Sequence, residues 1–600
     1  MGDSDRAEEI VVESFWKDSQ DFLRCGVGGK IPVINRSSRE DVADRPADDI
    51  NFKASLGKFI RYFGNKFAGV NFHLKEIEKI LLKNRGLTGE KARKEFLSPT
   101  APEALTLKGL GINQLQVKKA VERIKKAGKK GEMIIVYGDY DADGISATAV
   151  LWERLYSLGL NVLPHIPERF SEGYGLNSES IKKLKEENPS LGLIVTVDHG
   201  IVAGAQVEAA KKLGIDVIVT DHHQPGGKKP KPYALIHTTQ IGGAALAWIL
   251  AREIKSSRDG LDLVAIGTIA DQLPLVEANR SFAKYGLISL NSTRREGLKA
   301  LFSEAGIVEG DVGPYQVGFM IAPRINAMGR LVHAIDSLRL LCTKNSQRAG
   351  ELARLLNKTN LERQRIVEEV VLHARGSVKD TKEIIVLAHE SYHEGVIGLA
   401  AARLVEEFYR PAIVISKKGT LAKASARSIS GFNIIEAIRK LEGYLIEGGG
   451  HPMAAGFSIE TDKIEDFTLK LNKIASPALT EDILTKKLKI DLEVGFGNLG
   501  QELLALSQSF EPTGLGNPAP TFLTKKVIIV EARVVGRSGT HLKLVLEESG
   551  ARLEAIAFGL GGIYSRLSPE TKIDIAYALE ENTWNGRKSL QLKIKDIKVK

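Results

Sequence analysis

The sequence is poor in cysteine: only Cys25 and Cys342 occur in 600 residues. Such sparse usage excludes the dense disulfide framework of small secreted domains and fits a reducing compartment. No apolar run approaches the roughly 20 residues that a transmembrane helix needs. Residues Gly2 to Asp5 are polar or acidic and do not begin an apolar signal segment. These absences predict a soluble, cytoplasmic protein that does not contact a membrane.

The sequence also lacks an excess of acidic charge. It has 84 basic and 74 acidic side chains, which gives a net charge of +10. A basic balance suits an anionic partner such as nucleic acid, although a solvated basic surface would give the same count. At about 150 residues per domain, the length predicts about four domains.

Changes in residue pattern divide the chain into segments. The first is irregular, with a polar, charged stretch typical of loop or disorder. In the second, strand-like and helix-like runs alternate, which predicts a doubly wound parallel sheet. A long charged helix, a second smaller α/β domain and an all-β barrel of the OB type complete the prediction. The predicted segments are 1–75, 76–345, 346–378, 379–478 and 479–600.

Four clusters of acidic and histidine residues stand where strand-like apolar runs end. In a parallel α/β sheet the carboxyl ends of the strands form the ligand-binding edge. Carboxylate and imidazole groups without thiols favour hard or borderline divalent cations. The clusters therefore predict a metal-dependent hydrolase. They are Asp139-Tyr140-Asp141-Ala142-Asp143, Asp198-His199-Gly200, Asp221-His222-His223 and Asp271, the last after an expected strand at Leu263 to Ala270.

Two alternatives bear on these clusters. The first cluster begins like a calcium-binding EF-hand loop, but the twelfth position is Val150 instead of glutamate, which excludes that loop. A second interpretation is that the cluster is only an aspartate-rich turn that caps the next helix. Three packed carboxylates, however, repel one another unless cations neutralise them. Adjacent residues at a strand end point in different directions, so His222 can bind metal while His223 reaches substrate.

The four clusters resemble motifs I to IV of the DHH phosphoesterase superfamily, and further segments resemble the bacterial RecJ nucleases. The likeness runs from about residue 81 to the end of the sequence. One departure is His199, where the family often has cysteine. The segments that carry the likeness are Ile166–Phe170, Glu172–Leu176, Ala265–Asp271, Pro323–Arg330, Gly395–Gly398, Ala424–Ser428, Gly448–His451, Phe510–Pro518 and Trp584–Gly586.

The resemblance implies an exonuclease specific for single-stranded DNA that acts in DNA repair and recombination. It would degrade the strand from 5′ to 3′ and release 5′-mononucleotides with two Mn²⁺ ions, or with Mg²⁺. Two such ions can activate water and stabilise the leaving oxygen. We expect Asp198 to bridge them, with Asp139 and Asp141 on one ion and Asp143, His222 and Asp271 on the other.

The same resemblance implies residues that contact the substrate. Arg324 and Arg330 flank Asn326 in an expected short loop and would bind the nucleic-acid backbone. His223 and His451 would face the scissile phosphate. Family positions for the 5′-phosphate correspond to Arg169, Ser425 and Arg427. For the arginines a structural salt bridge is the alternative role, and for His451 it is a helix-capping glycine turn.

Two other functions remain open from the sequence. A nanoRNase, a cyclic-dinucleotide phosphodiesterase or a pyrophosphatase of the same superfamily would share the metal site, but would not need the long helix and barrel. A non-enzymatic replication scaffold is the second alternative, although such relatives lose metal ligands and all four clusters are intact here. The expected partner is single-stranded DNA, and a helicase and a single-strand-binding protein are further candidates.

Overall fold

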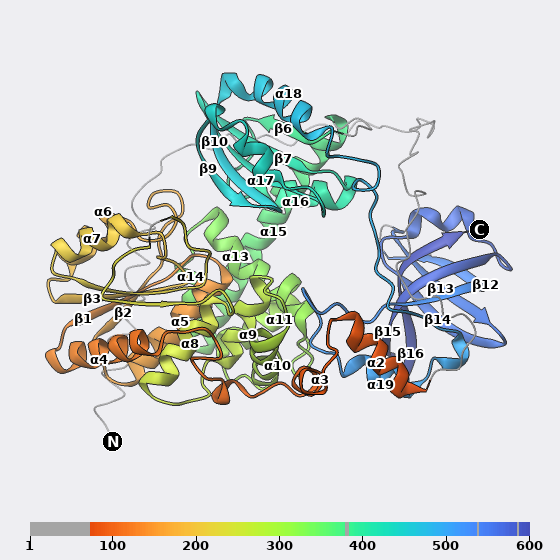
Figure 1. Cartoon of the computed structure of the whole chain (residues 1–600), viewed down its shortest axis with the longest axis horizontal. Helices are drawn as coiled ribbons and strands as arrows, with labels where there is room; N and C mark the ends of the chain where they lie inside the picture. The colour runs from red at the N-terminus through yellow and green to blue at the C-terminus, as the bar shows by residue number, and fades with distance from the viewer. Residues whose placement is uncertain (1–72, 228, 378–382, 537–538, 585–586, 600) are drawn as a thin grey trace. The chain divides into compact units, whose positions relative to one another are not determined.

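The computed structural model describes residues 73–599 except 228, 378–382, 537–538 and 585–586 (Figure 1). The predicted disorder of the N-terminal segment therefore falls almost wholly outside the described residues. Within them, no helix is both long enough and apolar enough to cross a membrane.

The first domain is built on a parallel five-stranded sheet in the order β2-β1-β3-β4-β5. Its strands are rich in valine, isoleucine and leucine and are largely buried, as expected when helices cover both faces of a parallel sheet. The chain leaves β1 towards β2 on one side and returns to β3 on the other, so a topological switch point lies between β1 and β3. The strands are β1 Met133–Tyr137, β2 Val162–His165, β3 Leu191–Val197, β4 Asp216–Asp221 and β5 Ala234–His237.

Helices connect these strands and then continue without strands to the end of the domain. The connecting helices are α5 Ala142–Ser157, α6 Ser178–Glu187 and α7 Gly204–Lys212, while α4 Gln114–Lys130 precedes β1 and α8 Gly243–Ile254 follows β5. The later ones are α9 Leu261–Ala270, α10 Glu277–Asn291, α11 Glu296–Ala305, α12 Pro314–Gln316, α13 Ala322–Leu331 and α14 Ile335–Cys342, with the π-helical segment η2 Val317–Ile321 before α13.

Two sequence predictions in this half are wrong. The apolar run before Asp271 is helix α9 and not a strand, because every residue from Leu261 to Ile269 is buried and an apolar run buried on all sides has no diagnostic period. Arg324, Asn326 and Arg330 lie in helix α13 and not in a short loop. Helix α13 continues directly from η2, so Pro323 lies within a longer helical segment, immediately after a π-helical turn.

The predicted long helix is present as α15, Ser346–Ser377. It leads to a second five-stranded sheet in the order β6-β7-β8-β10-β9, in which only β6 and β7 are parallel. Its strands are β6 Ile385–His389, β7 Ala412–Lys418, β8 Leu421–Arg427, β9 Leu445–His451 and β10 Ala454–Glu460. Its helices are α16 Ile397–Phe408, α17 Ile434–Arg439 and α18 Ile464–Ala475, with short turns η3 Glu442–Tyr444 and η4 Thr461–Lys463.

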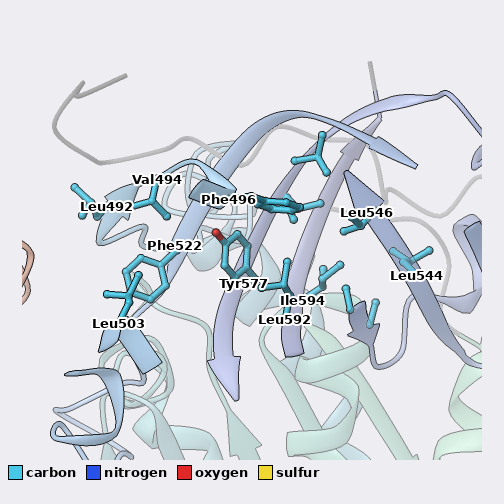
Figure 2. Close-up of a cluster of buried hydrophobic side chains, with 14 of the residues drawn as sticks. Leu492, Val494, Phe496, Leu503, Phe522, Leu544, Leu546, Tyr577, Leu592 and Ile594 are labelled. Atoms are coloured by element: carbon cyan, nitrogen blue, oxygen red, sulfur yellow. The ribbon is translucent and has the colours of Figure 1, made fainter. Parts of the chain in front are cut away.

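The C-terminal part is a closed five-stranded barrel, as predicted. Strand β12 pairs with both β13 and β15, and β14 pairs in parallel with β16, which closes the sheet. Figure 2 shows part of its core, including Phe522 and Tyr577. The hydroxyl of Tyr577 lies 2.8 Å from that of Thr524. The elements are β11 Leu492–Glu493, η5 Phe496–Asn498, α19 Gln501–Gln508, β12 Phe522–Val535, β13 His541–Glu548, β14 Ala551–Ala557, η6 Gly561–Arg566, β15 Lys572–Trp584 and β16 Arg587–Val599.

Side chains from the start of the described chain complete the barrel core. Helices α2 Leu74–Asn84 and α3 Glu90–Leu97 come before the first domain, followed by the turn η1 Pro102–Ala104. Ile77, Leu81, Leu82 and Phe96 nevertheless belong to the same buried cluster as the barrel strands. The predicted boundary at residue 76 groups these helices with the first domain, and the domain boundaries remain predictions.

Arg280 of α10 is fully buried and links these parts. Its Nε donates to the carbonyl of Phe96 at 2.6 Å, and its Nη atoms donate to the carbonyls of Phe510, Glu511 and Pro512 at 2.8–3.1 Å. The guanidinium carbon also lies 4.1 Å from the Phe96 ring centroid. Burial, and then the nearby Arg85, lowers the pKa of Arg280 to about 10, so it stays charged at neutral pH.

We expect Arg280→Met to destabilise the protein by about 3 kcal/mol or more, because several buried carbonyl groups would lose their donors. Urea unfolding monitored by limited proteolysis within the barrel would measure this loss. Arg294→Met is the matched control, since Arg294 is exposed and precedes α11. Equal stability of the two variants would contradict the linking role of Arg280.

Candidate metal and nucleic-acid site

The carboxyl ends of β1, β3 and β4, together with the end of α9, bring the predicted acidic clusters together at the switch point. Three overlapping groups of side chains have ligand atoms within 4.8 Å of one another. These groups are Asp139, Asp141 and Asp198; Asp143, His222 and Asp271; and Asp198, His222 and His223. All seven residues that the sequence singled out at these clusters as metal ligands or phosphate contacts are therefore neighbours in the fold.

The first acidic loop owes its shape to hydrogen bonds with its own backbone. The N–H groups of Asp143 and Gly144 donate to Oδ1 of Asp141, both at 3.0 Å, so Asp141 caps the start of α5. The N–H of Tyr140 donates to Oδ1 of Asp139 at 2.7 Å. Burial, and then repulsion from Asp141, raises the pKa of Asp139 well above its usual value. The acidic loop therefore both caps helix α5 and gathers carboxylates that repel one another.

Asp143 caps a second helix. The N–H of Gly243 donates to its Oδ2 at 2.6 Å and the N–H of Ala244 to its Oδ1 at 2.9 Å, so this carboxylate faces the positive end of α8. Burial, and then repulsion from Asp141, still raises the pKa of Asp143 to about 6. Both oxygens accept backbone hydrogen bonds, so any cation at Asp143 would share them with α8.

Asp198 is the central carboxylate. Its backbone lies in the left-handed region at φ 67°, a conformation that costs energy in a non-glycine residue and is concentrated at functional sites. Its Oδ1 is buried and accepts no hydrogen bond, although Nε2 of His222 lies 3.0 Å away. Burial, and then repulsion from Asp143 and other aspartates, raises the pKa of Asp198 well above its usual value.

The two adjacent histidines have different environments. Besides Asp198, Nε2 of His222 lies 3.7 Å from Asp271 and 3.9 Å from Asp143, and burial lowers the pKa of His222 to about 4. Nδ1 of His223 lies 2.8 Å from Oδ1 of Asp221. Burial alone would lower the pKa of His223, but this contact, together with the charges of Asp221, Asp271 and Asp139, outweighs burial and raises the pKa to about 9. His222 thus resembles a neutral ligand and His223 a cation.

Glycines leave room for the carboxylates. A Cβ atom on Gly243 would lie 2.4 Å from Oδ1 of Asp198, and one on Gly267 would lie 2.1 Å from Oδ1 of Asp143. One on Gly144 would lie 2.5 Å from Cβ of Asp139. Crowded acids, an oxygen without a donor and a neutral imidazole form a donor set that fits a divalent cation.

A group of arginines faces the acidic cluster. Burial, followed by repulsion from Arg169 and Arg363, lowers the pKa of Arg330 to about 10, and Arg427 adds to this effect. Nη1 of Arg330 donates to the carbonyl of Gly395 at 3.3 Å. The guanidinium of Arg169 lies 5.2 Å from the ring centroid of Tyr140. Like charges gathered in this way favour an anionic ligand.

Ser425 and Arg427 lie two residues apart on β8 and therefore on the same face. Nη1 of Arg427 donates to Oγ of Ser425 at 3.1 Å. A Cβ atom on Gly398, at the start of α16, would lie 2.9 Å from that Oγ and 3.1 Å from Nη2 of Arg427. The start of a helix, a hydroxyl and a guanidinium thus adjoin one another, which is a suitable environment for a phosphate group.

The structure also gives the surroundings of three further predicted residues. Arg324 is engaged within the helices, with Nη1 donating to the carbonyl of Met320 at 2.6 Å and Nε to Oδ1 of Asn357 at 3.1 Å. Asn326 accepts from the N–H of Ala142 at 2.7 Å and so supports the acidic loop from behind. His451 ends strand β9 and is exposed, so the glycines before it form a strand and not a helix cap.

Comparison with known proteins agrees with this architecture. Models of the DHH family N-terminal domain, the DHHA1 domain and the RecJ OB domain match residues 133–268, 381–476 and 490–596. The single-stranded-DNA-specific exonuclease RecJ of Bacillus subtilis is 37% identical over 546 residues, covering 88% of this chain and 68% of the relative. That of Escherichia coli is 32% identical over 523 residues, covering 80% and 90%.

The chain belongs to the RecJ family. A crystal structure of RecJ in complex with Mn²⁺ from Thermus thermophilus matches with a TM-score of 0.75 and 30% identity, covering 87% of this chain and 76% of that one. The structure of RecJ with Mg²⁺ from the same organism matches with a TM-score of 0.70 and 28% identity, covering 87% and 74%. The resemblance that the sequence motifs suggested is confirmed.

Several residues at the site of this RecJ-family chain had no assigned role in the sequence analysis. Asp221 orients His223 and also accepts from the N–H of Ile201 at 2.7 Å. Gly243 and Gly267 leave space for carboxylates, and Arg363 of α15 joins the arginine group. Glycine has only a hydrogen atom as its side chain, so its type does not indicate a role at a site. Arg363 is one of many charged residues on α15. Residue type alone therefore could not single out the glycines or Arg363.

Proposed function

We propose that this chain is a metal-dependent exonuclease specific for single-stranded DNA in DNA repair and recombination. It would hydrolyse the strand from its 5′ end and release 5′-mononucleotides. The observation that carries the proposal is the convergence of carboxylates around the donor-free oxygen of Asp198 at the switch point. RecJ relatives named as exonucleases, and RecJ structures solved with Mn²⁺ or Mg²⁺, support it.

We propose that Asp198 is a ligand shared by two divalent cations, Mn²⁺ or Mg²⁺. Its membership of two of the three ligand groups supports this role. Asp139 and Asp141 would hold one cation, and Asp143, His222 and Asp271 the other. When bound, such cations supply an activated water and stabilise the leaving oxygen of an in-line displacement at phosphorus.

The protein groups would orient the strand. His223 has its Nδ1 held by Asp221, which leaves Nε2 to donate to a phosphate oxygen. Arg330 and Arg363 would attract the phosphates of the backbone, and Asn326 would keep the acidic loop in place through Ala142. For Arg324 and His451 we propose contacts with the nucleic acid, for which Arg324 would have to leave its bonds within the helices.

The barrel would bind the strand beyond the catalytic domain. Phe558 is 54% exposed at the end of β14, Nζ of Lys593 lies 5.6 Å from its ring centroid, and the His541 ring lies 5.2 Å away. An exposed ring beside a lysine ammonium group suits a stacked base next to a phosphate. We further propose that the protein works in the cytoplasm with a helicase and a single-strand-binding protein. Co-purification of tagged protein from cells tests these partners.

Digestion of end-labelled single-stranded DNA, duplex DNA and RNA with Mn²⁺, with Mg²⁺ or with chelator tests the proposed function. We expect mononucleotides from single-stranded DNA only, no product with chelator, and shortening from the 5′ end. Cleavage restricted to dinucleotides would instead support a nanoRNase, and full binding without cleavage would support a scaffold.

We propose that Arg427, Ser425 and Arg169 bind the 5′-terminal phosphate, supported by the adjoining start of α16. Arg427→Ala is expected to weaken use of a 5′-phosphorylated strand by about 1.5–3 kcal/mol, the usual contribution of a hydrogen bond to a charged group. A 5′-hydroxyl strand should be affected much less. Comparison of kcat/KM on the two strands measures the difference.

Arg403→Ala is the matched control for this prediction. Arg403 lies on α16 of the same domain, but it is exposed and pairs with Glu406 at 3.1 Å. Its replacement should leave both strands unaffected. Equal losses on both strands for Arg427→Ala would show that Arg427 supports the domain and not the strand end.

A further inference from the structure

The loop between β2 and α6 projects functional side chains from a short stretch of backbone. Arg169 follows Glu168 in this loop, and Tyr174 lies with its ring 6.3 Å from that of His223. The Phe170 ring lies 5.9 Å from that of His393, which belongs to the domain formed by β6 to β10. The position of this loop therefore determines where the Arg169 guanidinium stands.

The loop contains flexible elements that need support. Gly173 and Gly175 have φ values of 84° and 75°, in the left-handed region that glycine adopts readily. Two backbone bonds close a turn, from the N–H groups of Glu172 and Gly173 to the carbonyl of Glu168 at 2.9 and 3.2 Å. These bonds fix the turn locally but do not attach it to the sheet.

The side chain of Glu172 makes that attachment. Its Oε1 accepts a hydrogen bond from the backbone N–H of Glu168 at 3.0 Å, and Glu168 directly precedes Arg169. Its Oε2 lies 3.2 Å from Nε2 of His165 at the end of β2 and accepts from the hydroxyl of Ser180 in α6. The carbonyl of Glu172 also accepts from Nδ2 of Asn177 at 3.0 Å. One carboxylate thus links the loop, the strand before it and the helix after it.

We propose that Glu172 is a positioning residue that holds Arg169 in place for the terminal phosphate of the strand. This inference rests on the proposed role of Arg169 and extends it to a residue that does not touch the substrate. The side chain of Glu172 is 22% exposed, and its oxygens already contact Glu168, His165 and Ser180, so it is not available to bind the DNA strand.

The charge state of Glu172 agrees with this geometry. Burial alone would raise the pKa of Glu172, but the hydrogen bonds from His165, Ser180 and Glu168 outweigh it and lower the pKa to about 2. The carboxylate is therefore ionised at neutral pH and accepts from all of its neighbours at once. An ionised acceptor forms stronger hydrogen bonds than a neutral one.

Steady-state kinetics of Glu172→Ala on short strands with and without a 5′-phosphate tests the proposal. We expect KM for the phosphorylated strand to rise about tenfold, because small displacements of binding groups are costly, while kcat changes less than twofold. The hydroxyl strand should be affected little. Glu168→Ala is the matched control: it removes a carboxylate from the same loop that accepts from the hydroxyl of Ser171, a contact that stays within the loop.

A double-mutant cycle with Arg169→Ala separates positioning from general stability. If Glu172 acts through Arg169, adding Glu172→Ala to Arg169→Ala should cause no further loss, whereas independent effects would add. Additive losses would overturn the proposal. Glu172→Gln keeps the shape of the side chain and one acceptor oxygen, so its KM should lie between those of the wild type and Glu172→Ala. If Glu172→Ala does not fold, Glu172→Gln takes its place in the cycle.

Hydrogen exchange provides a readout that does not depend on the proposed function. Glu172→Ala should accelerate exchange of the amides of residues 168–173, whatever Arg169 binds. Faster exchange with unchanged kinetics would confirm the anchor but refute the role of Arg169 at the terminal phosphate. Unchanged exchange would refute the anchor itself.

Discussion

Asp198→Asn is expected to abolish nuclease activity and, at the same time, to raise the melting temperature of the metal-free protein. Activity is lost because the residue is the carboxylate common to two of the ligand groups. Stability rises because the substitution removes a carboxylate from a buried cluster, in which burial, and then mutual repulsion, raises the pKa values of Asp198 and Asp271. Turnover of labelled single-stranded DNA and thermal unfolding with chelator measure the two effects.

The change in melting temperature on adding metal separates the loss of metal binding from the loss of charge repulsion. Wild-type protein should melt at a higher temperature when Mn²⁺ is added, because a ligand that binds only the folded state stabilises it. Asp198→Asn should show little of this shift. Asp262→Asn is the control: Asp262 is also buried, but it lies 2.9 Å from the guanidinium of Arg295, so its replacement should destabilise the protein. A destabilised metal-free Asp198→Asn would contradict the proposed repulsion.

Gly243→Ala is expected to reduce activity by at least about a hundredfold, the scale on which misplacing catalytic groups by about 1 Å acts. Its Cβ atom would lie 2.4 Å from Oδ1 and 2.5 Å from Cβ of Asp198, a distance that real Cβ atoms do not tolerate. Asp198 or the start of α8 must therefore move. Overpacking of this kind also costs about 1–3 kcal/mol of stability. Kinetics and urea unfolding would measure both losses.

Gly204→Ala provides a close control. Gly204 is the first residue of α7, as Gly243 is the first residue of α8, and a Cβ atom there would meet nothing within 4 Å. Alanine should leave activity unchanged and stabilise the helix slightly. If both substitutions behaved alike, the close approach of α8 to Asp198 would not matter for catalysis.

The sequence could predict features that are determined locally. Short runs of valine and isoleucine bounded by polar residues predicted β1, β3 and β4, and the carboxylates after them met where a parallel sheet requires. The all-β pattern of residues 479–600 predicted the barrel, and the long charged segment at 346–378 predicted α15.

Other features depend on contacts between distant residues and could not be predicted. Helix α9 was mistaken for a strand because complete burial removes the period that distinguishes the two. Asp143 caps α8 through a residue 100 positions away in the sequence, so this contact could not be predicted from the local pattern. The bond of Arg324 to Asn357 likewise depends on the packing of α13 against α15.

The contribution of α2 to the barrel core has a consequence for biosynthesis. Asn84 at the end of α2 donates to the carbonyl and the side chain of Asp491, which lies 407 residues later in the chain. At about 5–20 residues per second, the ribosome needs roughly 20–80 s to make the intervening chain. Throughout that time Ile77, Leu81 and Leu82 lack the strands that bury them. Helix α2, the first of the described residues to be translated, is therefore among the last to reach its native contacts, and a nascent chain stalled before the barrel should be a substrate for chaperones that bind exposed apolar segments.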